Sequence, residues 1–291
     1  MTSSTLLSKT GLNTTIDKVG FRESTKKPAK PFLKWVGGKT QLLGELKKYV
    51  PKTFNKYIEP FVGGGALLFD LAPQKAVIND ANEELINAYI ILRDYVDELI
   101  QELSKYPHNT EFYYRMRAEK PNNLSNVERA ARMIYLNKTC FNGLYRVNKK
   151  GEFNVPVGRY TNPTICDEEK LKSAHVALQG VVIECNDFIK VLRKYAEKDD
   201  FIYIDPPYHP VGKNSDFKRY TKDFFYKEDQ IALKSLIIEL KKRGCFVVAS
   251  NSYCDFILDL YKDFDIKIVN AKRYINKIAS RRNDIKEIII L

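Results

Sequence analysis

The chain has 291 residues, enough to bury a large core as one domain or as a domain that carries an insertion. Its composition, 44% hydrophobic and 29% charged, is typical of a globular protein, and no run approaches the roughly 18 apolar residues that predict a membrane span. The formal net charge of +12 favours a polyanionic partner such as a nucleic acid. We expect no membrane partner, and we expect a cytoplasmic location because the N-terminus lacks an apolar signal core.

The cysteines and histidines form no pattern that is typical of a metal centre. The five cysteines are scattered without a C-x-x-C pair, so we expect reduced, mostly buried thiols rather than a disulfide framework. The three histidines are also isolated in the sequence. We therefore predict no metal site.

Residues 1–30 are rich in Ser, Thr and Lys, lack hydrophobic periodicity and are expected to form a flexible N-terminal arm. The next segment, FLKWVGGKT from Phe32, resembles the end of a phosphate-binding loop. The full pattern G-x-x-x-x-G-K-[ST] needs a glycine where this chain has Leu33, and the loop should follow a strand rather than Lys30-Pro31. The sequence therefore disfavours a nucleotide hydrolase, and Lys39 needs another role.

A strand, a glycine turn and a helix follow in residues 56–72, KYIEPFVGGGALLFDLA. Three consecutive glycines, Gly63 to Gly65, let the backbone approach a ligand closely, and the N–H groups at the start of the helix face that ligand. A second strand, residues 75–80, ends in Asp80, where a carboxylate can accept hydrogen bonds from both hydroxyls of a ribose. The pattern indicates NAD or S-adenosylmethionine, and the absence of G-x-G-x-x-G disfavours NAD. An ordinary tight turn is the alternative.

Beyond the second strand, the alternation of strands and helices is interrupted. The spacing of apolar residues predicts one long helix over 81–106, further helices near 111–120 and 126–139, and a hairpin over 141–160 that turns at Lys149 to Gly151. Residues 129–159 hold seven Lys or Arg against one acid, and smaller basic clusters occur at 213–222 and 272–282. We interpret residues 105–175 as an inserted, mainly helical domain that binds a polyanion.

Strands return in the second half of the chain. They are predicted at 181–187, 201–205 and 245–251, each followed by a helix, with a terminal antiparallel pair at 266–273 and 285–291. Apolar strands that alternate with helices predict a mostly parallel sheet covered on both faces. The expected fold class is therefore α/β, with residues 31–104 and 176–291 forming one domain around the insert.

The strand at 201–205 runs into Asp205-Pro206-Pro207-Tyr208, where two prolines make a stiff turn at the carboxyl end of the sheet. This arrangement suits methylation of an exocyclic amine, whose lone pair is delocalised into its base. The Asp205 carboxylate and the Pro206 carbonyl can accept hydrogen bonds from the two N–H groups and stabilise the positive charge that develops. Tyr208 can stack on the base once it has left the duplex. Taken alone, the four residues could form an ordinary turn.

Together these motifs resemble the Dam-type, D12-class DNA adenine-N6 methyltransferases, in the α arrangement that places a DNA-recognition insert between strands two and three. The resemblance runs from about Phe32 to the C-terminus and rests on motifs in the family's order: FLKWVGGK, EPFVGGGALLFDLA, VINDAN, FNGLYRVNKKGEFNVPVGRY, DPPY and SNS. It implies a Rossmann-like methyltransferase sheet, S-adenosylmethionine as cofactor and double-stranded DNA as partner. It also implies that adenine is flipped out of the duplex and methylated by direct in-line transfer, with residues 105–175 as the target-recognition domain.

The resemblance assigns roles to particular residues. The catalytic residues would be Asp205, Pro206, Pro207 and Tyr208. The cofactor would be bound by Trp35, Lys39, Phe61, Gly63, Gly65, Asp80, Asp187 and Phe188. DNA would be contacted by Lys34, Phe141, Asn142, Leu144, Arg146 and Pro156, with Arg146 suited to read guanine. The family often has Gly-Asp-Phe where this chain has Asn186 before Asp187, which leaves Asp187 in register. A core aromatic for Trp35 and a helix cap for Asp187 are the structural alternatives.

The hairpin sequence FNGLYR is similar to that of family members that read GATC, so we expect methylation within GATC. Asp-Pro-Pro-Tyr does not fix the base chemically, so methylation of RNA adenine or of cytosine N4 stays open, as does a non-catalytic DNA-binding module. By this resemblance we expect a bacterial or phage protein. A companion restriction endonuclease that acts on the same site is a further expected partner, without required physical contact.

Overall fold

The computed structural model of the chain describes residues 29–209, 225–272 and 284–291. The expected N-terminal arm and the basic clusters at 213–222 and 272–282 lie almost wholly outside these ranges. In the described part of the chain, no helix has the length and apolar character needed to cross a membrane.

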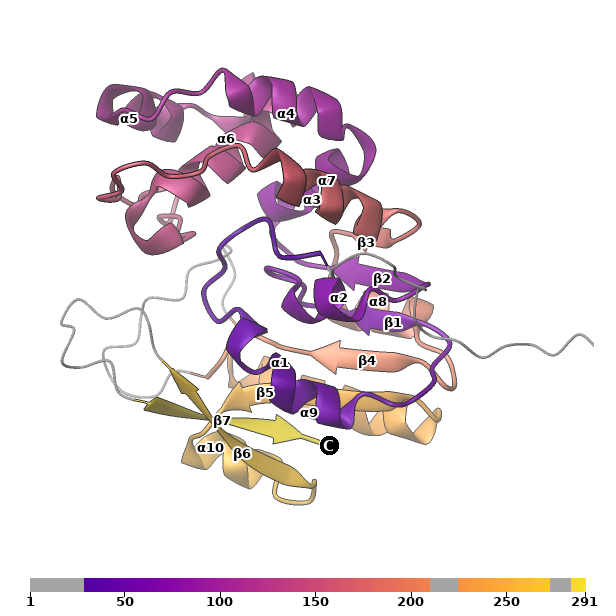
Figure 1. Cartoon of the computed structure of the whole chain (residues 1–291). Helices are drawn as coiled ribbons and strands as arrows, with labels where there is room; N and C mark the ends of the chain where they lie inside the picture. Colours follow the sequence, from indigo (N-terminus) through magenta and orange to yellow (C-terminus); the bar gives the residue numbers. More distant parts are fainter. Residues whose placement is uncertain (1–28, 210–224, 273–283) are drawn as a thin grey trace, which may run out of the picture.

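A seven-stranded sheet runs through the described residues (Figure 1). Its strands are β1 (Tyr57–Glu59), β2 (Ala76–Asn79), β3 (Val182–Glu184), β4 (Phe201–Ile204), β5 (Phe246–Ser252), β6 (Ile266–Lys272) and β7 (Asp284–Ile290). The order is β3-β2-β1-β4-β5-β7-β6, in which the first five strands are parallel and β7 is antiparallel to both of its neighbours. The predicted mostly parallel α/β sheet is confirmed, and so is the antiparallel pair at its end.

Side chains of the central strands alternate between two hydrophobic cores. Tyr57 and Phe201, which are register partners on β1 and β4, face one core, and the adjacent partners Ile58 and Ile202 face the other. All four side chains are fully buried. Because both faces of the sheet are covered, these strands have no solvent-facing polar side and are mostly apolar in sequence, with Glu59 at the end of β1 as a buried exception. The carboxyl ends of the parallel strands lie side by side and form what we call the carboxyl edge of the sheet. The motifs predicted to be functional directly follow these strand ends.

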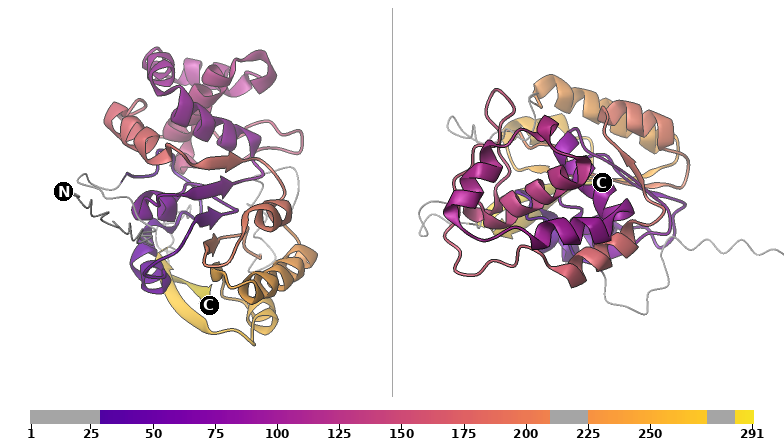
Figure 2. Two further views of the ribbon diagram at one scale, coloured as in Figure 1. Left: turned by 90° about the vertical axis from the view of Figure 1, so that its right-hand side faces the viewer. Right: turned by 90° about the horizontal axis from the view of Figure 1, so that it is seen from above.

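Helices cover both faces of the sheet. On the side of Tyr57 lie η1 (Lys39–Gln41), α1 (Leu43–Leu46), η2 (Lys47–Tyr49) and α2 (Ala66–Leu71), and on the side of Ile58 lie α8 (Phe188–Tyr195), α9 (Lys227–Lys242) and α10 (Asp255–Leu260). The left view of Figure 2 shows these two groups on opposite sides of the strands. The result is a three-layer arrangement in which only the ends of the strands are open to ligands.

A further group of helices lies beyond the β3 edge of the sheet (Figure 1). It comprises α3 (Glu83–Asp94), α4 (Val96–Ser104), α5 (Thr110–Ala118), η3 (Pro121–Asn123), α6 (Asn126–Thr139), η4 (Phe141–Gly143) and α7 (Glu168–Leu178). Helix α6 begins with a capping box, in which Ser125 and Glu128 exchange side chain–backbone hydrogen bonds. It is buried along most of its length and packs against α3, α4 and α5, so it forms the centre of this group. Helix α7 crosses the predicted boundary at residue 175, and the division into domains stays a prediction.

The long helix predicted over 81–106 is interrupted at Tyr95. The expectation of one helix is wrong, because Tyr95 has φ −138° and ψ 46°, which ends α3 and starts α4. Leu92 before the break and Leu99 after it are both fully buried. The change of direction lets both helices turn an apolar side toward α6, whereas the spacing of apolar residues runs through Tyr95 without interruption.

The hairpin predicted over 141–160 is irregular. Single antiparallel bridges join Val147 to Phe153 and Cys140 to Val157, in place of a continuous ladder. The turn is closed by a hydrogen bond of 3.0 Å from the Gly151 N–H to the Asn148 carbonyl. The predicted position of the turn is therefore confirmed.

Candidate active site at the carboxyl edge of the sheet

The glycine turn, Gly63 to Gly65, is tied to the end of β2. The Gly63 N–H donates to Oδ2 of Asp80 over 3.1 Å, and the Asn82 N–H donates to Oδ1 over 3.0 Å. Burial raises the pKa of Asp80 to about 6, although its hydrogen bonds from backbone N–H groups act in the opposite direction. Gly63 and Gly65 have φ of 46° and 66°, in the left-handed region that favours glycine. The turn therefore places the Asp80 carboxylate beside the backbone of Gly63, where β1 and β2 end.

Trp35 lies against this turn. A Cβ added to Gly63 would lie 2.7 Å from Cδ1 of Trp35, and one added to Gly64 would lie 3.1 Å from Cβ of Trp35. The indole ring also stacks on Tyr145 of the 141–160 hairpin, with ring centroids 5.5 Å apart. Trp35 thus forms a wall between the glycine turn and the hairpin, and the turn has no room for side chains on that side.

Asp205 follows β4 and pairs with Lys39. The Lys39 ammonium, which is 5% exposed, lies 3.0 Å from Oδ2 of Asp205. The other carboxylate oxygen, Oδ1, is buried and has no hydrogen-bond partner among the described residues. Burial raises the pKa of Asp205 to about 6, and Lys39 limits that rise. One oxygen of Asp205 is therefore held by the protein, and the other is available to a ligand donor.

A second carboxylate completes this cluster from the middle of β7, where Glu287 is the register partner of Ser252 at the end of β5. Oε2 of Glu287 lies 3.7 Å from the Lys39 ammonium and accepts a hydrogen bond of 2.7 Å from the Tyr208 hydroxyl. Lys39 also lies 4.6 Å from the centroid of the Tyr208 ring, at cation–π distance. Lys39, Asp205, Tyr208 and Glu287 therefore form one connected group at the carboxyl ends of β4 and its neighbours.

The Pro-Pro turn is supported by polar side chains from α9 and β5. Gln230 Nε2 donates to the Pro207 carbonyl over 3.1 Å, and Asn251 Nδ2 donates to Gln230 Oε1 over 3.0 Å. The Ser252 hydroxyl donates to the His209 carbonyl over 3.2 Å. Gln230 and Asn251 are almost completely buried. These contacts fix the backbone that carries Asp205 and Tyr208, which gives the SNS motif at 250–252 a structural role.

Two aromatic side chains flank the site on the α8 side. Phe61, after β1, packs on Phe188 at the start of α8 with ring centroids 5.0 Å apart, and Phe225 contacts both rings. Asp187 caps α8, because its Oδ1 accepts hydrogen bonds of 3.0 and 3.1 Å from the N–H groups of Ile189 and Lys190. The structure therefore brings both predicted aromatic residues together, and it gives Asp187 the capping role that was the alternative.

Comparison with known proteins identifies the family. A model described as D12 class N6 adenine-specific DNA methyltransferase matches residues 35–275. The chain belongs to this family. The type II methyltransferase M.MjaIII of Methanocaldococcus jannaschii is 47% identical, over 90% of this chain and 98% of its own. The type II methyltransferase M1.LlaDCHI of Lactococcus lactis subsp. cremoris is 44% identical over 90% and 94%, and the DNA adenine methylase of Escherichia coli K12 is 32% identical over 91% and 96%.

Membership in the D12 class confirms the expected methyltransferase fold and the expected adenine-specific DNA methyltransferase activity. A methyl donor is required by that reaction. The roles of individual site residues stay predictions. Most of the predicted catalytic and cofactor residues lie together at the carboxyl edge, whereas Lys39, predicted on the cofactor side, contacts Asp205, Glu287 and Tyr208.

The residues predicted to contact DNA lie on or beside the 141–160 hairpin. Phe141 is 39% exposed, and its N–H donates to the Pro156 carbonyl over 2.9 Å. Asn142 is also exposed and has φ 56°. Arg146 is half-buried, and its Nε donates to Oδ1 of Asn154 over 2.7 Å. The hairpin therefore presents an aromatic ring and an amide to solvent and holds Arg146 in a fixed orientation.

Sequence reasoning missed the polar residues that support this D12-class site. Glu287 is the one acid in the C-terminal segment IKEIIIL, and an isolated acid in an apolar strand is the signal that could have marked it. Gln230 and Asn251 carry no such signal, because amides are common on helix and strand surfaces. Their importance depends on burial, which the sequence does not display.

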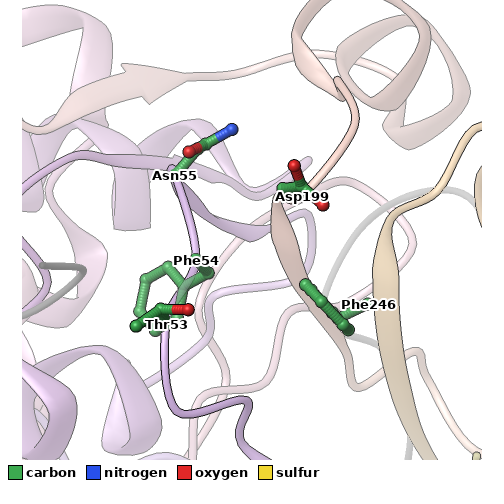
Figure 3. Close-up of a pocket in the computed structure, with 5 residues that line it drawn as sticks. All are labelled: Thr53, Phe54, Asn55, Asp199 and Phe246. Carbon is green, nitrogen blue, oxygen red and sulfur yellow. The ribbon is translucent and has the colours of Figure 1, made fainter. Parts of the chain in front are cut away.

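A separate hollow of about 60 Å³ lies at the opposite, amino end of the strands (Figure 3). It is lined by Thr53, Phe54, Asn55, Asp199 and Phe246. These residues precede or begin β1, β4 and β5, and none of them is a predicted site residue. The hollow is therefore not part of the candidate active site.

Proposed function

We propose that this D12-class enzyme transfers a methyl group from S-adenosylmethionine to N6 of adenine in double-stranded DNA, within the sequence GATC. The observation that carries the proposal is the asymmetric Asp205 carboxylate. Its Oδ2 is held 3.0 Å from Lys39, and its buried Oδ1 has no partner among the described residues. A buried acceptor without a partner is costly unless a ligand donor satisfies it, and an exocyclic N–H is such a donor.

The cofactor fits the surroundings of the glycine turn. The glycine turn carries no side chains and Asp80 lies beside it, so a nucleoside cofactor could approach the backbone closely and place its ribose hydroxyls on a carboxylate acceptor. Phe61 would line the methionine part of the cofactor, and Phe188, next to Asp187, would hold its adenine ring by apolar contact. Trp35 would form the wall of the pocket beside Gly63. When bound, S-adenosylmethionine supplies an activated methyl group.

The residues of the chain would activate the target amine. Adenine must leave the duplex to reach the carboxyl edge of the sheet, and Tyr208 would stack on the flipped base. Asp205 Oδ1 and the Pro206 carbonyl would accept hydrogen bonds from the two N6–H groups, which localises the nitrogen lone pair and stabilises positive charge as the new C–N bond forms. With a pKa of about 6, Asp205 can take the proton that N6 then loses and release it to water.

Recognition of GATC would use the hairpin. Arg146 has the guanidinium geometry that reads guanine through two hydrogen bonds, and Asn154 already orients it. Leu144 and Pro156 would contact base edges, and Phe141 with Asn142 would border the gap left by the flipped base. Lys34 would contact the DNA beside them. The similarity to type II methyltransferases supports a companion restriction endonuclease for the same site, and DNA as substrate supports a cytoplasmic location.

Transfer of labelled methyl groups tests the proposal. The purified protein is incubated with S-[methyl-³H]adenosylmethionine and one of three substrates: a duplex with one GATC site, a matched duplex with GTAC in its place, or the GATC sequence as RNA. Label is expected in the first duplex only. Label in RNA, in cytosine, or equally in both duplexes would contradict the substrate that we propose.

A further inference from the structure

The side chain of Asn137, in α6, binds a segment 103 residues away. Its Oδ1 accepts a hydrogen bond of 2.8 Å from the Lys34 N–H, and its Nδ2 donates to the Lys34 carbonyl over 2.7 Å. The same nitrogen donates to the Gly143 carbonyl over 3.1 Å. Asn137 is only 1% exposed. One buried amide thus joins the backbone at Lys34 to the start of the 141–160 hairpin.

Steric fit strengthens this junction. Gly143 has φ 63°, and a Cβ at this position would lie 2.5 Å from Cδ of Lys34. The Lys34 ammonium lies 4.6 Å from the centroid of the Tyr160 ring, near the other end of the hairpin. Lys34 therefore lies across the hairpin, and its backbone cannot shift independently of residues 141–143.

The next residue along the chain carries the contact to the cofactor side. The side chain of Trp35 lies against Gly63 and Gly64. Its ring stacks on the ring of Tyr145, with centroids 5.5 Å apart. A displacement of the hairpin when it binds DNA must therefore move Lys34 and Trp35, and with them the wall of the cofactor site. The reverse holds when the cofactor fixes Trp35.

We infer that Asn137 is a positioning residue that couples DNA binding to cofactor binding. It contacts neither ligand, and it acts by holding the Lys34 backbone to the hairpin so that Trp35 and residues 141–145 move as one unit. The inference rests on the proposed function, because it needs S-adenosylmethionine at the glycine turn and DNA at the hairpin. By linkage, each ligand then changes the affinity for the other by the same factor.

The coupling factor is measured directly with the full chain. The Kd of a GATC duplex is determined by fluorescence anisotropy with and without saturating S-adenosylhomocysteine, and the Kd of S-adenosylhomocysteine is determined with and without the duplex. In the parent protein each ligand should lower the Kd of the other by about fivefold or more. In Asn137→Ala the two factors should fall below about twofold, a change that a general loss of stability does not produce.

Thr139→Val is the matched control. Thr139 is also buried in α6, and its hydroxyl donates within the helix to the Tyr135 carbonyl, so this change perturbs the same helix without touching Lys34. The control should keep the coupling factor of the parent. Tyr145→Leu, which leaves Asn137 intact and removes the stack on Trp35, is a second test and should also lower the factor.

The outcomes separate the inference from the proposed function. A parent protein that binds neither ligand would overturn the proposed function and this inference with it. A parent that binds both ligands without coupling overturns the inference alone. So does coupling that survives in Asn137→Ala, or that is lost equally in Thr139→Val.

Discussion

The ammonium of Lys39 lies 3.0 Å from Oδ2 of Asp205, and this pair joins the first motif of the chain to the Asp-Pro-Pro-Tyr turn that follows β4. The lysine of the segment that resembles a phosphate loop, Lys39, therefore forms an ion pair with a carboxylate of the protein. Lys39 keeps Asp205 closer to the ionised form in a buried site and leaves Oδ1 for a ligand. Glu287 shares the same lysine, so one buried cation lies within 4 Å of two carboxylates.

Replacement of Glu287 by Gln should impair turnover more than binding. The substitution keeps the shape of the side chain but removes one of the two negative charges beside Lys39 and weakens the acceptor of the Tyr208 hydroxyl. We expect kcat to fall about 10- to 100-fold, as for other residues that orient catalytic groups, with the Kd of S-adenosylhomocysteine within about twofold of the parent. Single-turnover kinetics and calorimetry measure the two quantities.

Glu197→Gln, at an exposed ion pair with Lys56, is the control and should leave both kcat and the Kd unchanged. An unaltered kcat in Glu287→Gln would show that Tyr208 and Lys39 do not need this carboxylate.

Replacement of Lys39 by Met should move the pH dependence of transfer. Asp205 must be ionised to accept the amine N–H groups, so the rate of the parent should fall as the pH drops through about 6, the pKa of Asp205. Lys39 lowers that pKa, so its removal should shift the acid limb of the pH–rate profile to higher pH. Profiles of single-turnover rate against pH, from pH 5 to 9, measure the shift. An acid limb that stays in place or moves downward would contradict the assigned interaction.

The change Asp205→Asn should abolish transfer and raise stability at neutral pH. The folded pKa of about 6 exceeds the ordinary value of 3.8, so the folded state favours the protonated carboxyl, and ionisation at pH 7 costs about 3 kcal/mol at 1.36 kcal/mol per unit. Asn carries no charge and avoids this cost. Thermal unfolding should show a Tm several degrees above that of the parent at pH 7 to 8, with the difference shrinking as the pH falls through 6 and vanishing below about 4. A variant with a lower Tm than the parent at pH 7 would mean that the Lys39–Asp205 pair stabilises the fold.

The substitution Gly63→Ala should reduce cofactor affinity through a direct clash with Trp35. The new Cβ would lie 2.7 Å from the indole, at a residue with φ 46°. We expect the Kd of S-adenosylhomocysteine to rise about tenfold or more, since Trp35 must move out of the wall it forms. Gly180→Ala is the matched control, because Gly180 has φ 74° but a Cβ added there would have no atom within 4 Å. The control should lose about 1 kcal/mol of stability, the cost of a Cβ in the left-handed region, without loss of cofactor affinity. Equal losses of affinity in the two variants would attribute the effect to backbone strain alone.

The parts of the fold that depend on neighbouring residues could be predicted from the sequence. Apolar strands such as residues 201–204 and glycine turns such as Gly63 to Gly65 carry their own local patterns, and their order along the chain indicates the parallel sheet. The break at Tyr95 escaped prediction because it depends on how α3 and α4 pack on α6. An amphipathic spacing is the same for a straight helix and for two helices that meet at an angle.

The supporting residues of the site could not be predicted for a related reason. Glu287 reaches Lys39 only because β7 inserts between β5 and β6, an antiparallel pairing over a long stretch of chain. Asn137 and Lys34 meet across 103 residues. Single polar residues of this kind have no periodic signal, so their function follows from burial and three-dimensional contact rather than from sequence pattern.

Sequencing of the modified base at single-nucleotide resolution tests the central claim most directly. Unmethylated plasmid DNA is incubated with S-adenosylmethionine and either the parent protein or Asp205→Ala, and the position and identity of each methylated base are determined. The proposed function predicts N6-methyladenine in GATC on both strands with the parent and no modification with the variant. Methylated cytosine, N6-methyladenine outside GATC, or modification by Asp205→Ala would contradict it.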